Sequence, residues 1–231
     1  MIRDIFFPAK CPVCDKPVIP QGRMICKKCD KTFGYICEPF CKKCGKQMTD
    51  EFKEYCHDCM NKEHLFDYGI SLYDYKTVQE ALFRFKYQGR PEYADYFGRD
   101  IVKRYRSEIE RMEAEVLIPV PLYRRKELKR GYNQSELVAR VVGKAVNIPV
   151  DTTLIKRVVD TKPQKTLDDM ERQNNLKKAF IIARNDVKLS KVIIVDDVYT
   201  TGSTMDAVSR ILRSVGVKRI CFLTIASGSG V

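Results

Sequence analysis

The stretch 192–204 constrains the fold more than any other part of the chain. It begins with four apolar, β-branched residues, continues with Asp196 and Asp197, and ends in a loop of small and hydroxyl residues. A short apolar run that ends in polar residues is typical of a buried parallel strand. After the loop, apolar residues recur at helical spacing up to an expected stop at Gly216, namely Met205, Val208, Ile211 and Leu212. The stretch therefore predicts a strand, an acid pair, a loop and a helix.

The residue types of this stretch suit a phosphorylated sugar. A helix N-terminus offers unpaired N–H groups and the positive end of the helix dipole to a phosphate. Carboxylates repel phosphate but accept hydrogen bonds from neighbouring sugar hydroxyls. We therefore predict that Asp196 and Asp197 hold a ribose, and that its 5-phosphate lies against Thr200, Thr201, Gly202, Ser203 and Thr204. The alternative is a plain turn in which Ser203 caps the helix and both acids are solvated, which explains neither the paired acids nor the paired threonines.

Residues 195–204 resemble the phosphoribosyl pyrophosphate (PRPP) motif of type I phosphoribosyltransferases. This resemblance implies an α/β fold, in which a twisted, mainly parallel sheet carries helices on both faces. A small N-terminal module joins it, as the cysteines indicate.

Nine of the ten cysteines lie before residue 60, in a repeated pattern. Two CxxC pairs recur thirty positions later as two more, which gives the predicted zinc ligands Cys11, Cys14, Cys26 and Cys29, then Cys41, Cys44, Cys56 and Cys59. Two CxxC turns complete a closed tetrahedral zinc site, which stabilises a small fold and leaves no open position for a substrate. Disulfides are the alternative, but the paired CxxC form favours metal. Cys37 is an additional candidate ligand, whereas His57 is expected in solvent and Cys221 in the core.

Three parts follow from these patterns: a double zinc ribbon over 1–62, a connecting strand and helical segment over 63–110, and the phosphoribosyltransferase-like domain over 111–231. In the middle part, alternation predicts a strand at 70–75, and an amphipathic helix follows with Val78, Leu82 and Phe85 on its apolar side. Residues 83–87 interleave aromatic and basic side chains, as single-stranded nucleic-acid platforms do. Helical spacing favours a core-facing role for them instead.

The first strand of the main domain is expected at 116–121, followed by a cation-rich loop and a helix with Leu137, Val138, Val141 and Val142 on its apolar side. Cations after a strand and near a phosphate site, among them Arg124 and Arg130, could hold pyrophosphate, or they could form an ordinary basic surface. The polar segment 161–175 is interpreted as a lid from which Lys162, Lys165 or Arg172 reaches the ligand, with a passive surface loop as the alternative.

The composition limits the kinds of partner and the cellular location that we expect for the protein. The 231 residues are 44% hydrophobic, which supports a sizeable core, and the net charge of +12 favours polyanionic partners. No apolar run approaches membrane length, and residues 5–8 are too short for the core of a signal peptide. We therefore expect a soluble, cytoplasmic protein without membrane insertion.

The motifs together are similar to those of the ComF family of competence proteins. The shared features, in order, are the ribbon cysteines, Pro-Val-Pro-Leu at 119–122, Arg-Gly-Tyr-Asn-Gln at 130–134, the spaced polar residues of 161–175 and the acid pair. The resemblance implies structural Zn²⁺ and a cytoplasmic role in natural transformation and DNA uptake. It also implies that the protein handles incoming single-stranded DNA with a ComFA-type helicase.

Two classes of function stay open. In the first, PRPP binds with Mg²⁺, Asp196 and Asp197 act as the catalytic pair that positions the ribose, and the phosphoribosyl group moves to an unknown acceptor. In the second, the same pocket senses PRPP or a nucleotide, or binds a nucleic-acid phosphate, while the ribbons and the basic surface bind single-stranded DNA and the helicase.

Overall fold

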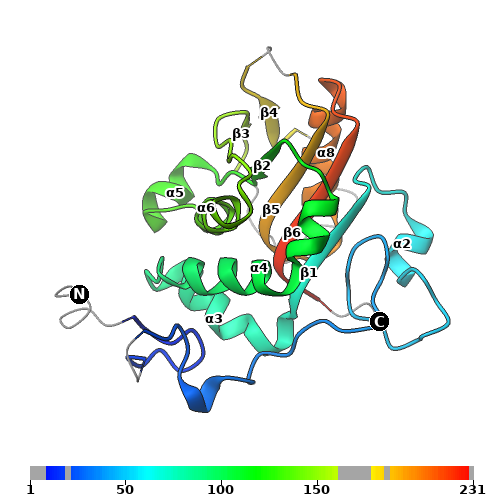
Figure 1. Ribbon diagram of the computed structural model, residues 1–231. Helices are drawn as coiled ribbons and strands as arrows, with labels where there is room; N and C mark the ends of the chain where they lie inside the picture. The colour runs from blue at the N-terminus through cyan, green and yellow to red at the C-terminus, as the bar shows by residue number, and fades with distance from the viewer. Residues whose placement is uncertain (1–8, 19–21, 161–177, 185–187, 229–231) are drawn as a thin grey trace.

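The computed structural model describes residues 9–18, 22–160, 178–184 and 188–228 (Figure 1). A four-stranded parallel sheet lies at the centre, in the order β1-β6-β5-β2, and a separate antiparallel pair joins β3 to β4. The strands are β1 Tyr68–Asp74, β2 Val116–Pro119, β3 Ile155–Arg157, β4 Phe180–Ile182, β5 Lys191–Tyr199 and β6 Arg219–Ser227. The helices are the 3-10 turn η1 Lys27–Cys29, α2 His57–Asn61, α3 Tyr75–Tyr87, α4 Tyr93–Arg111, α5 Arg124–Arg130, α6 Gln134–Val146 and α8 Ser203–Ser214.

Both faces of the sheet are covered, as the sequence predicts for a parallel sheet. On β5, Ile193 and Val195 face a core formed with α3, α4 and α6, whereas Val192 and Ile194 face a core formed with α8. β-Branched residues pack well on a pleated surface, and strands buried on both faces read as continuous apolar runs.

Strand β5 is longer than the sequence predicts. Its pairing with β6 continues beyond the apolar run, from Asp196 opposite Thr224 to Tyr199 opposite Ser227. The acid pair therefore lies inside the strand rather than after it, because ladder hydrogen bonds to β6 hold this polar end extended.

The expectation that the main sheet begins at 116–121 is wrong. Strand β1 already belongs to that sheet, because it pairs in parallel with β6 from Tyr68 opposite Cys221 to Asp74 opposite Ser227. Helix α3 follows at once, capped by the Asp74 carboxylate, which accepts a hydrogen bond from the Lys76 N–H at 3.0 Å. The segment 63–110 thus contributes β1, α3 and α4 to the same body, and pairing between the first and last strands is not visible in sequence order.

The cysteine-rich N-terminal region contacts this body at two separate places. Cys11, Val18 and Ile25 form a small cluster of their own, which Tyr96 of α4 covers. In contrast, Cys41, Cys44 and Cys56 belong to the large core that contains α8 and Phe222 of β6. The first ribbon therefore packs on the helices of one face of the sheet, and the second ribbon packs into the core of the other face.

Helix α4 is the longest in the described part of the chain and carries charged residues along its length. No helix within the described ranges combines the length and the apolar character needed to cross a membrane.

Candidate functional site

The acid pair lies where the carboxyl ends of β2 and β5 adjoin. Helix α6, the second helix after β2, packs on one face of the sheet, and helix α8, which follows β5, packs on the other. Such a switch point opens a crevice that binds ligands in many parallel α/β folds. The position of Asp196 and Asp197 thus follows from the topology as well as from the motif.

Hydrogen bonds fix both carboxylates. Asp197 Oδ2 accepts from Gln134 Nε2 at 2.6 Å, and its Oδ1 pairs with Lys86 Nζ at 2.8 Å. Asp196 Oδ1 accepts from Ser135 Oγ at 2.9 Å and from the Asp197 N–H at 2.8 Å. Helices α3 and α6 therefore both deliver donors to the end of β5.

The surroundings of Asp196 and Lys86 shift the pKa of each group. Burial, and then the adjacent charge of Asp197, raise the pKa of Asp196 to about 7. Burial acts to lower the pKa of Lys86, but the charge of Asp197, the hydrogen bond to it and the charge of Asp196 together raise that pKa. At neutral pH the arrangement thus keeps a Lys86–Asp197 ion pair beside a carboxyl group close to its titration point.

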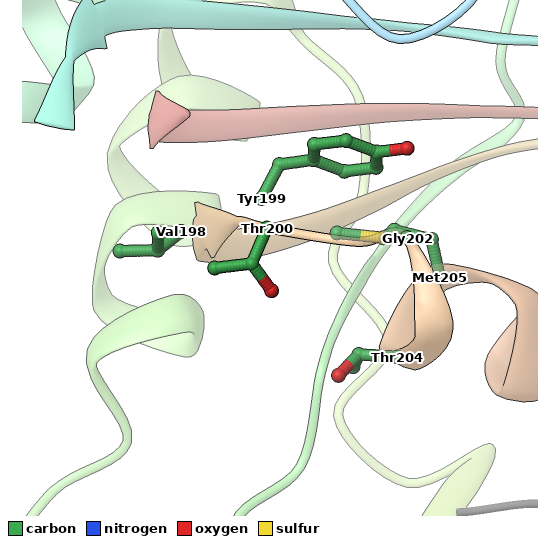
Figure 2. A pocket seen from close by; sticks show the side chains of 6 residues that line it. All are labelled: Val198, Tyr199, Thr200, Gly202, Thr204 and Met205. Carbon is green, nitrogen blue, oxygen red and sulfur yellow. The ribbon is translucent and has the colours of Figure 1, made fainter. Parts of the chain in front are cut away.

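The loop after β5 forms a small pocket lined by Val198, Tyr199, Thr200, Gly202, Thr204 and Met205 (Figure 2). Figure 2 shows the side chains of Thr200 and Thr204 on the side of the loop away from the Tyr199 ring. Thr201 Oγ1 and Ser203 Oγ lie 2.9 Å apart in a hydrogen bond. Hydroxyl groups therefore surround the N-terminus of α8.

No side chain of the described residues caps α8, so the alternative in which Ser203 caps it is wrong. Ser203 is its first helical residue, and the capping position belongs to Gly202, with φ of +78°. A Cβ added at Gly202 would lie 2.7 Å from both His64 Cε1 and the Tyr199 hydroxyl. Only glycine fits here, and the capping position provides no side-chain acceptor for the first N–H groups of α8.

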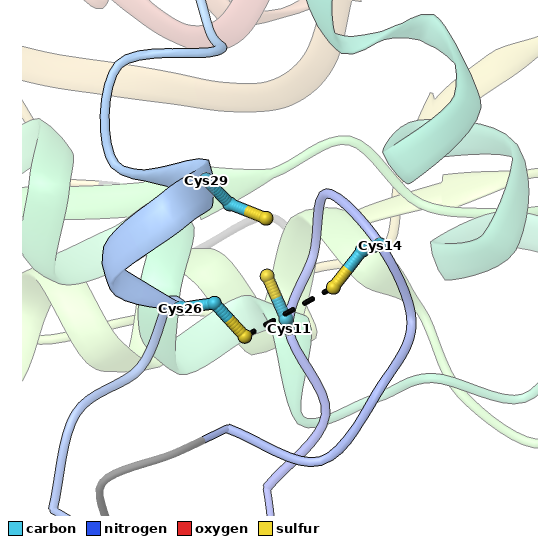
Figure 3. A group of neighbouring side chains, drawn as sticks. All are labelled: Cys11, Cys14, Cys26 and Cys29. Carbon is cyan, nitrogen blue, oxygen red and sulfur yellow. Dashed lines mark hydrogen bonds between the residues drawn. The ribbon is translucent and has the colours of Figure 1, made fainter.

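Two cysteine tetrads occur at the positions that the repeat predicts. Cys11, Cys14, Cys26 and Cys29 form one group and Cys41, Cys44, Cys56 and Cys59 the other, with all four sulfurs of each group within 4.8 Å of one another. Figure 3 shows the first group, in which a loop and the η1 turn bring their sulfurs together. The Sγ atoms of Cys14 and Cys26 lie 3.9 Å apart, and those of Cys44 and Cys56 lie 3.6 Å apart. A tetrahedral site with Zn–S bonds of about 2.3 Å spaces its sulfurs by about 3.8 Å, so both tetrads fit Zn²⁺.

Cys37 lies outside both tetrads. It is exposed, and its sulfur accepts a hydrogen bond from Arg104 at 3.5 Å. His57 is exposed at the start of α2, and Cys221 is buried in the core, as the sequence predicts for each.

The N-terminal part and the C-terminal part of the chain each match a known protein family. The double zinc ribbon domain matches residues 2–60, and the phosphoribosyl transferase domain matches residues 128–229. Competence protein F of Haemophilus influenzae is 32% identical over 175 residues, which are 73% of this chain and 76% of that protein. The chain belongs to the ComF family of competence proteins.

Two other members of this group are more distant. The DNA utilization protein YhgH of Salmonella typhi is 27% identical over 214 residues, 91% of this chain and 86% of that protein. Competence protein ComFC of Bacillus subtilis is 27% identical over 169 residues, 70% of this chain and 67% of that protein.

The predicted cations of this ComF-family chain do not all gather at the site. Arg130 donates a hydrogen bond to Gln134, which in turn binds Asp197, so it joins the network of the acid pair. Arg124 is exposed at the start of α5, a short helix that occupies the predicted cation-rich loop. Lys162, together with Lys165, Arg172 and the predicted lid, lies outside the described residues.

Sequence analysis missed Lys86, Gln134 and Ser135 as site residues. All three belong to helices that approach the end of β5 from one side, so their role depends on tertiary packing. The sequence does contain a signal for Gln134 and Ser135. They follow the N-cap Asn133 at the start of α6, near the carboxyl end of β2, where a ligand at a switch point is expected.

The aromatic and basic run on α3 divides between core and surface. Phe85 is fully buried, whereas Phe83 and Tyr87 are 53% and 67% exposed, with ring centroids 5.2 Å apart. The Arg130 guanidinium lies 5.2 Å from the centroid of the Tyr87 ring. The core-facing interpretation is therefore right for Phe85 and wrong for Phe83 and Tyr87.

Proposed function

We propose that this competence protein binds PRPP through its ribose 5-phosphate group and handles incoming single-stranded DNA in the cytoplasm. One observation carries the first half of the proposal: the fixed acid pair Asp196–Asp197 and the uncapped N-terminus of α8 adjoin at the switch point of the sheet. Carboxylate oxygens suit the ribose hydroxyls, and the hydroxyl-rich helix start suits the 5-phosphate.

The pyrophosphate of PRPP needs cations that the acid pair does not supply. Mg²⁺ prefers oxygen ligands and commonly binds through substrate phosphates together with one or two carboxylates. We propose that Mg²⁺ accompanies PRPP in this way, and that Arg130, which donates to Gln134 of the acid-pair network, contributes a cation.

The decisive experiment is calorimetric titration of the zinc-loaded protein with PRPP and Mg²⁺. We expect binding by the native chain and loss of binding when Asp196→Asn and Asp197→Asn are combined, because the amides lose the charged acceptors for the ribose hydroxyls. Phe83→Ala, on the exposed face of α3, is the matched control and should bind as the native chain does. Unchanged affinity in a folded double variant would refute the site. Pyrophosphate release from the bound PRPP would add turnover to the proposal, as in a phosphoribosyltransferase.

For single-stranded DNA we propose the surface formed by Phe83, Tyr87 and Arg130, which lies beside helix α5 with its cations. Exposed aromatic rings stack on bases of any sequence, and nearby cations neutralise the phosphates. This surface continues into the PRPP pocket, because Arg130 contacts both Tyr87 and Gln134.

Phe83→Ala with Tyr87→Ala should weaken binding of a single-stranded oligonucleotide by about tenfold or more, since stacking contributes about 1–3 kcal/mol per base. The affinity of the native chain should also fall steeply with salt. Binding that ignores both changes would place the DNA elsewhere. A ComFA-type helicase is the protein partner that we propose on the family resemblance, and co-purification with the full chain tests it.

A further inference from the structure

A short segment connects the second cysteine tetrad directly to the first turn of α8. Cys59 lies in α2, which ends at Asn61, and the next residues converge on Asp206. The Asp206 carboxylate accepts from Lys62 Nζ at 3.0 Å, from His64 Nδ1 at 2.9 Å and from the Leu65 N–H at 3.0 Å. One carboxylate in the first turn of α8 thus binds three groups that follow the second tetrad.

His64 makes this connection rigid. Its side chain is fully buried where it hydrogen-bonds to Asp206, and its ring stacks on Phe66 with centroids 4.7 Å apart. Its Cε1 lies 2.7 Å from where a Cβ of Gly202 would be, so the ring packs against the turn that opens α8. His64 Nε2 is buried and has no hydrogen-bond partner among the described residues. Among the described residues, Nδ1 therefore makes the one hydrogen bond of this side chain, and losing it removes the polar link between the ring and α8.

The first tetrad makes contacts of a different kind. Arg84 of α3 donates to the carbonyls of Pro12 and Val13 at 2.9 and 2.8 Å. Asp15 pairs with Arg90 at 2.7 Å and accepts from the Tyr93 hydroxyl at 2.7 Å. Within the described residues, these contacts join the first ribbon to α3, α4 and the turn between them, and none of them reaches the loop 200–204.

We propose that the second cysteine tetrad, when it holds zinc, sets the conformation of the phosphate-binding loop through the His64–Asp206 contact. His64 is then a positioning residue, since it acts on the loop and touches no ligand. The expected effect of zinc on ligand affinity rests on the proposed ribose 5-phosphate site. By linkage, a phosphate ligand must raise the zinc affinity of the second tetrad by the same factor by which zinc raises the ligand affinity.

Amide hydrogen exchange of the full-length, zinc-saturated chain tests the link without any ligand. Exchange over residues 199–206 should accelerate at least about tenfold in His64→Gln and in Cys59→Ser, because the loop loses its anchor. His64→Asn should stay near the native rate, since the asparagine amide can donate from the position of Nδ1. Cys14→Ser, which removes a ligand of the first tetrad, should accelerate exchange in the first ribbon and leave 199–206 unchanged. Native exchange over 199–206 in both His64→Gln and Cys59→Ser would overturn the proposal.

Titration with ribose 5-phosphate then measures the consequence for binding. Because a hydrogen bond to a charged group stabilises the loop, His64→Gln should bind ribose 5-phosphate about tenfold more weakly than the native chain does. The affinity of His64→Asn should stay within about threefold of the native value. Tyr93→Phe, which removes a hydrogen bond between the first ribbon and the body, is the control and should bind as the native chain does. If the native chain fails to bind ribose 5-phosphate, the proposed function fails while the exchange experiment still decides the link. If it binds and His64→Gln binds equally well, the positioning role fails.

Discussion

Replacing Lys86 with methionine should destabilise the protein in a way that depends on pH. Methionine keeps most of the side-chain volume but removes the charge from the 2.8 Å pair with Asp197, whose side chains are 21% and 9% exposed. Removing one partner of a buried ion pair costs about 3–5 kcal/mol, because the other charge stays buried without its counter-charge. Lys86 is partly exposed and Gln134 still donates to Asp197, so we expect the lower end, about 3 kcal/mol at pH 8.

Lowering the pH should reduce this loss. The charge of Lys86 lowers the pKa of Asp196 in the native chain, so Lys86→Met raises that pKa above its native value of about 7. Between pH 7 and the raised pKa, the folded variant binds up to one more proton than the folded native chain does. From pH 8 to pH 6 the loss therefore shrinks by up to about 1.4 kcal/mol, to about 2 kcal/mol at pH 6.

Chemical denaturation of zinc-saturated protein, followed by circular dichroism at pH 6 and pH 8, measures both effects. The control is Lys86→Met combined with Asp197→Asn, which removes both charges and should recover about 2 kcal/mol at pH 8. The reasoning is refuted if Lys86→Met loses less than about 0.5 kcal/mol at both pH values, or if the two substitutions simply add.

Three further predictions follow from the same contacts. Because burial and Asp197 raise the pKa of Asp196 to about 7, its ionised form, which accepts hydrogen bonds best, gains population as the pH rises. The affinity for ribose 5-phosphate, measured by calorimetry, should thus increase from pH 6 to 8. In Asp196→Asn, only the pH dependence that comes from the ionisation of the phosphate, with a pKa of about 6, should remain. Gly202→Ala should lower the free energy of unfolding by about 2 kcal/mol or more, since its Cβ would clash with His64 and Tyr199 at a positive φ. In the control Gly89→Ala, the new Cβ meets no atom within 4 Å, so the free energy of unfolding should fall only by the strain of the positive φ. Chelation of zinc should make residues 9–62 sensitive to protease, and a resistant segment after complete metal removal would contradict structural zinc.

Local pattern predicts the parts of the site that lie together in sequence. The acid pair, the hydroxyl loop, α8 and the CxxC tetrads each depend on residues within a few positions of one another, so spacing alone identifies them. The partners of these groups come from far along the chain. Lys86 meets Asp197 across 111 positions, and His64 meets Asp206 across 142. No periodicity encodes such a contact, because it arises only when β1 pairs with β6 and brings the N-terminal half against β5.

The same topology explains why helical spacing wrongly places Phe83 and Tyr87 in the core. Helical spacing places Val78, Leu82 and Phe85 on one side of α3, and the sequence offers no way to see that Phe83 and Tyr87 stay largely exposed. Aromatic residues are apolar enough to count as core in any periodicity argument. Their exposure becomes visible only once α3 is seen to pack on the sheet with a single face.

The two halves of the proposed ligand are supported from opposite faces of the sheet. Helices α3 and α6 of one face hold the acid pair through Lys86, Gln134 and Ser135, whereas the second ribbon holds the phosphate loop through His64 on the other face. Lys86 and His64 share no partner among the described residues, so each acts on its own half of the site. Effects on independent sites add in free energy. On the proposed function, we therefore expect the second ribbon to change the affinity for the 5-phosphate and not that for the ribose, which separates a structural metal from the acid pair that any turnover would need.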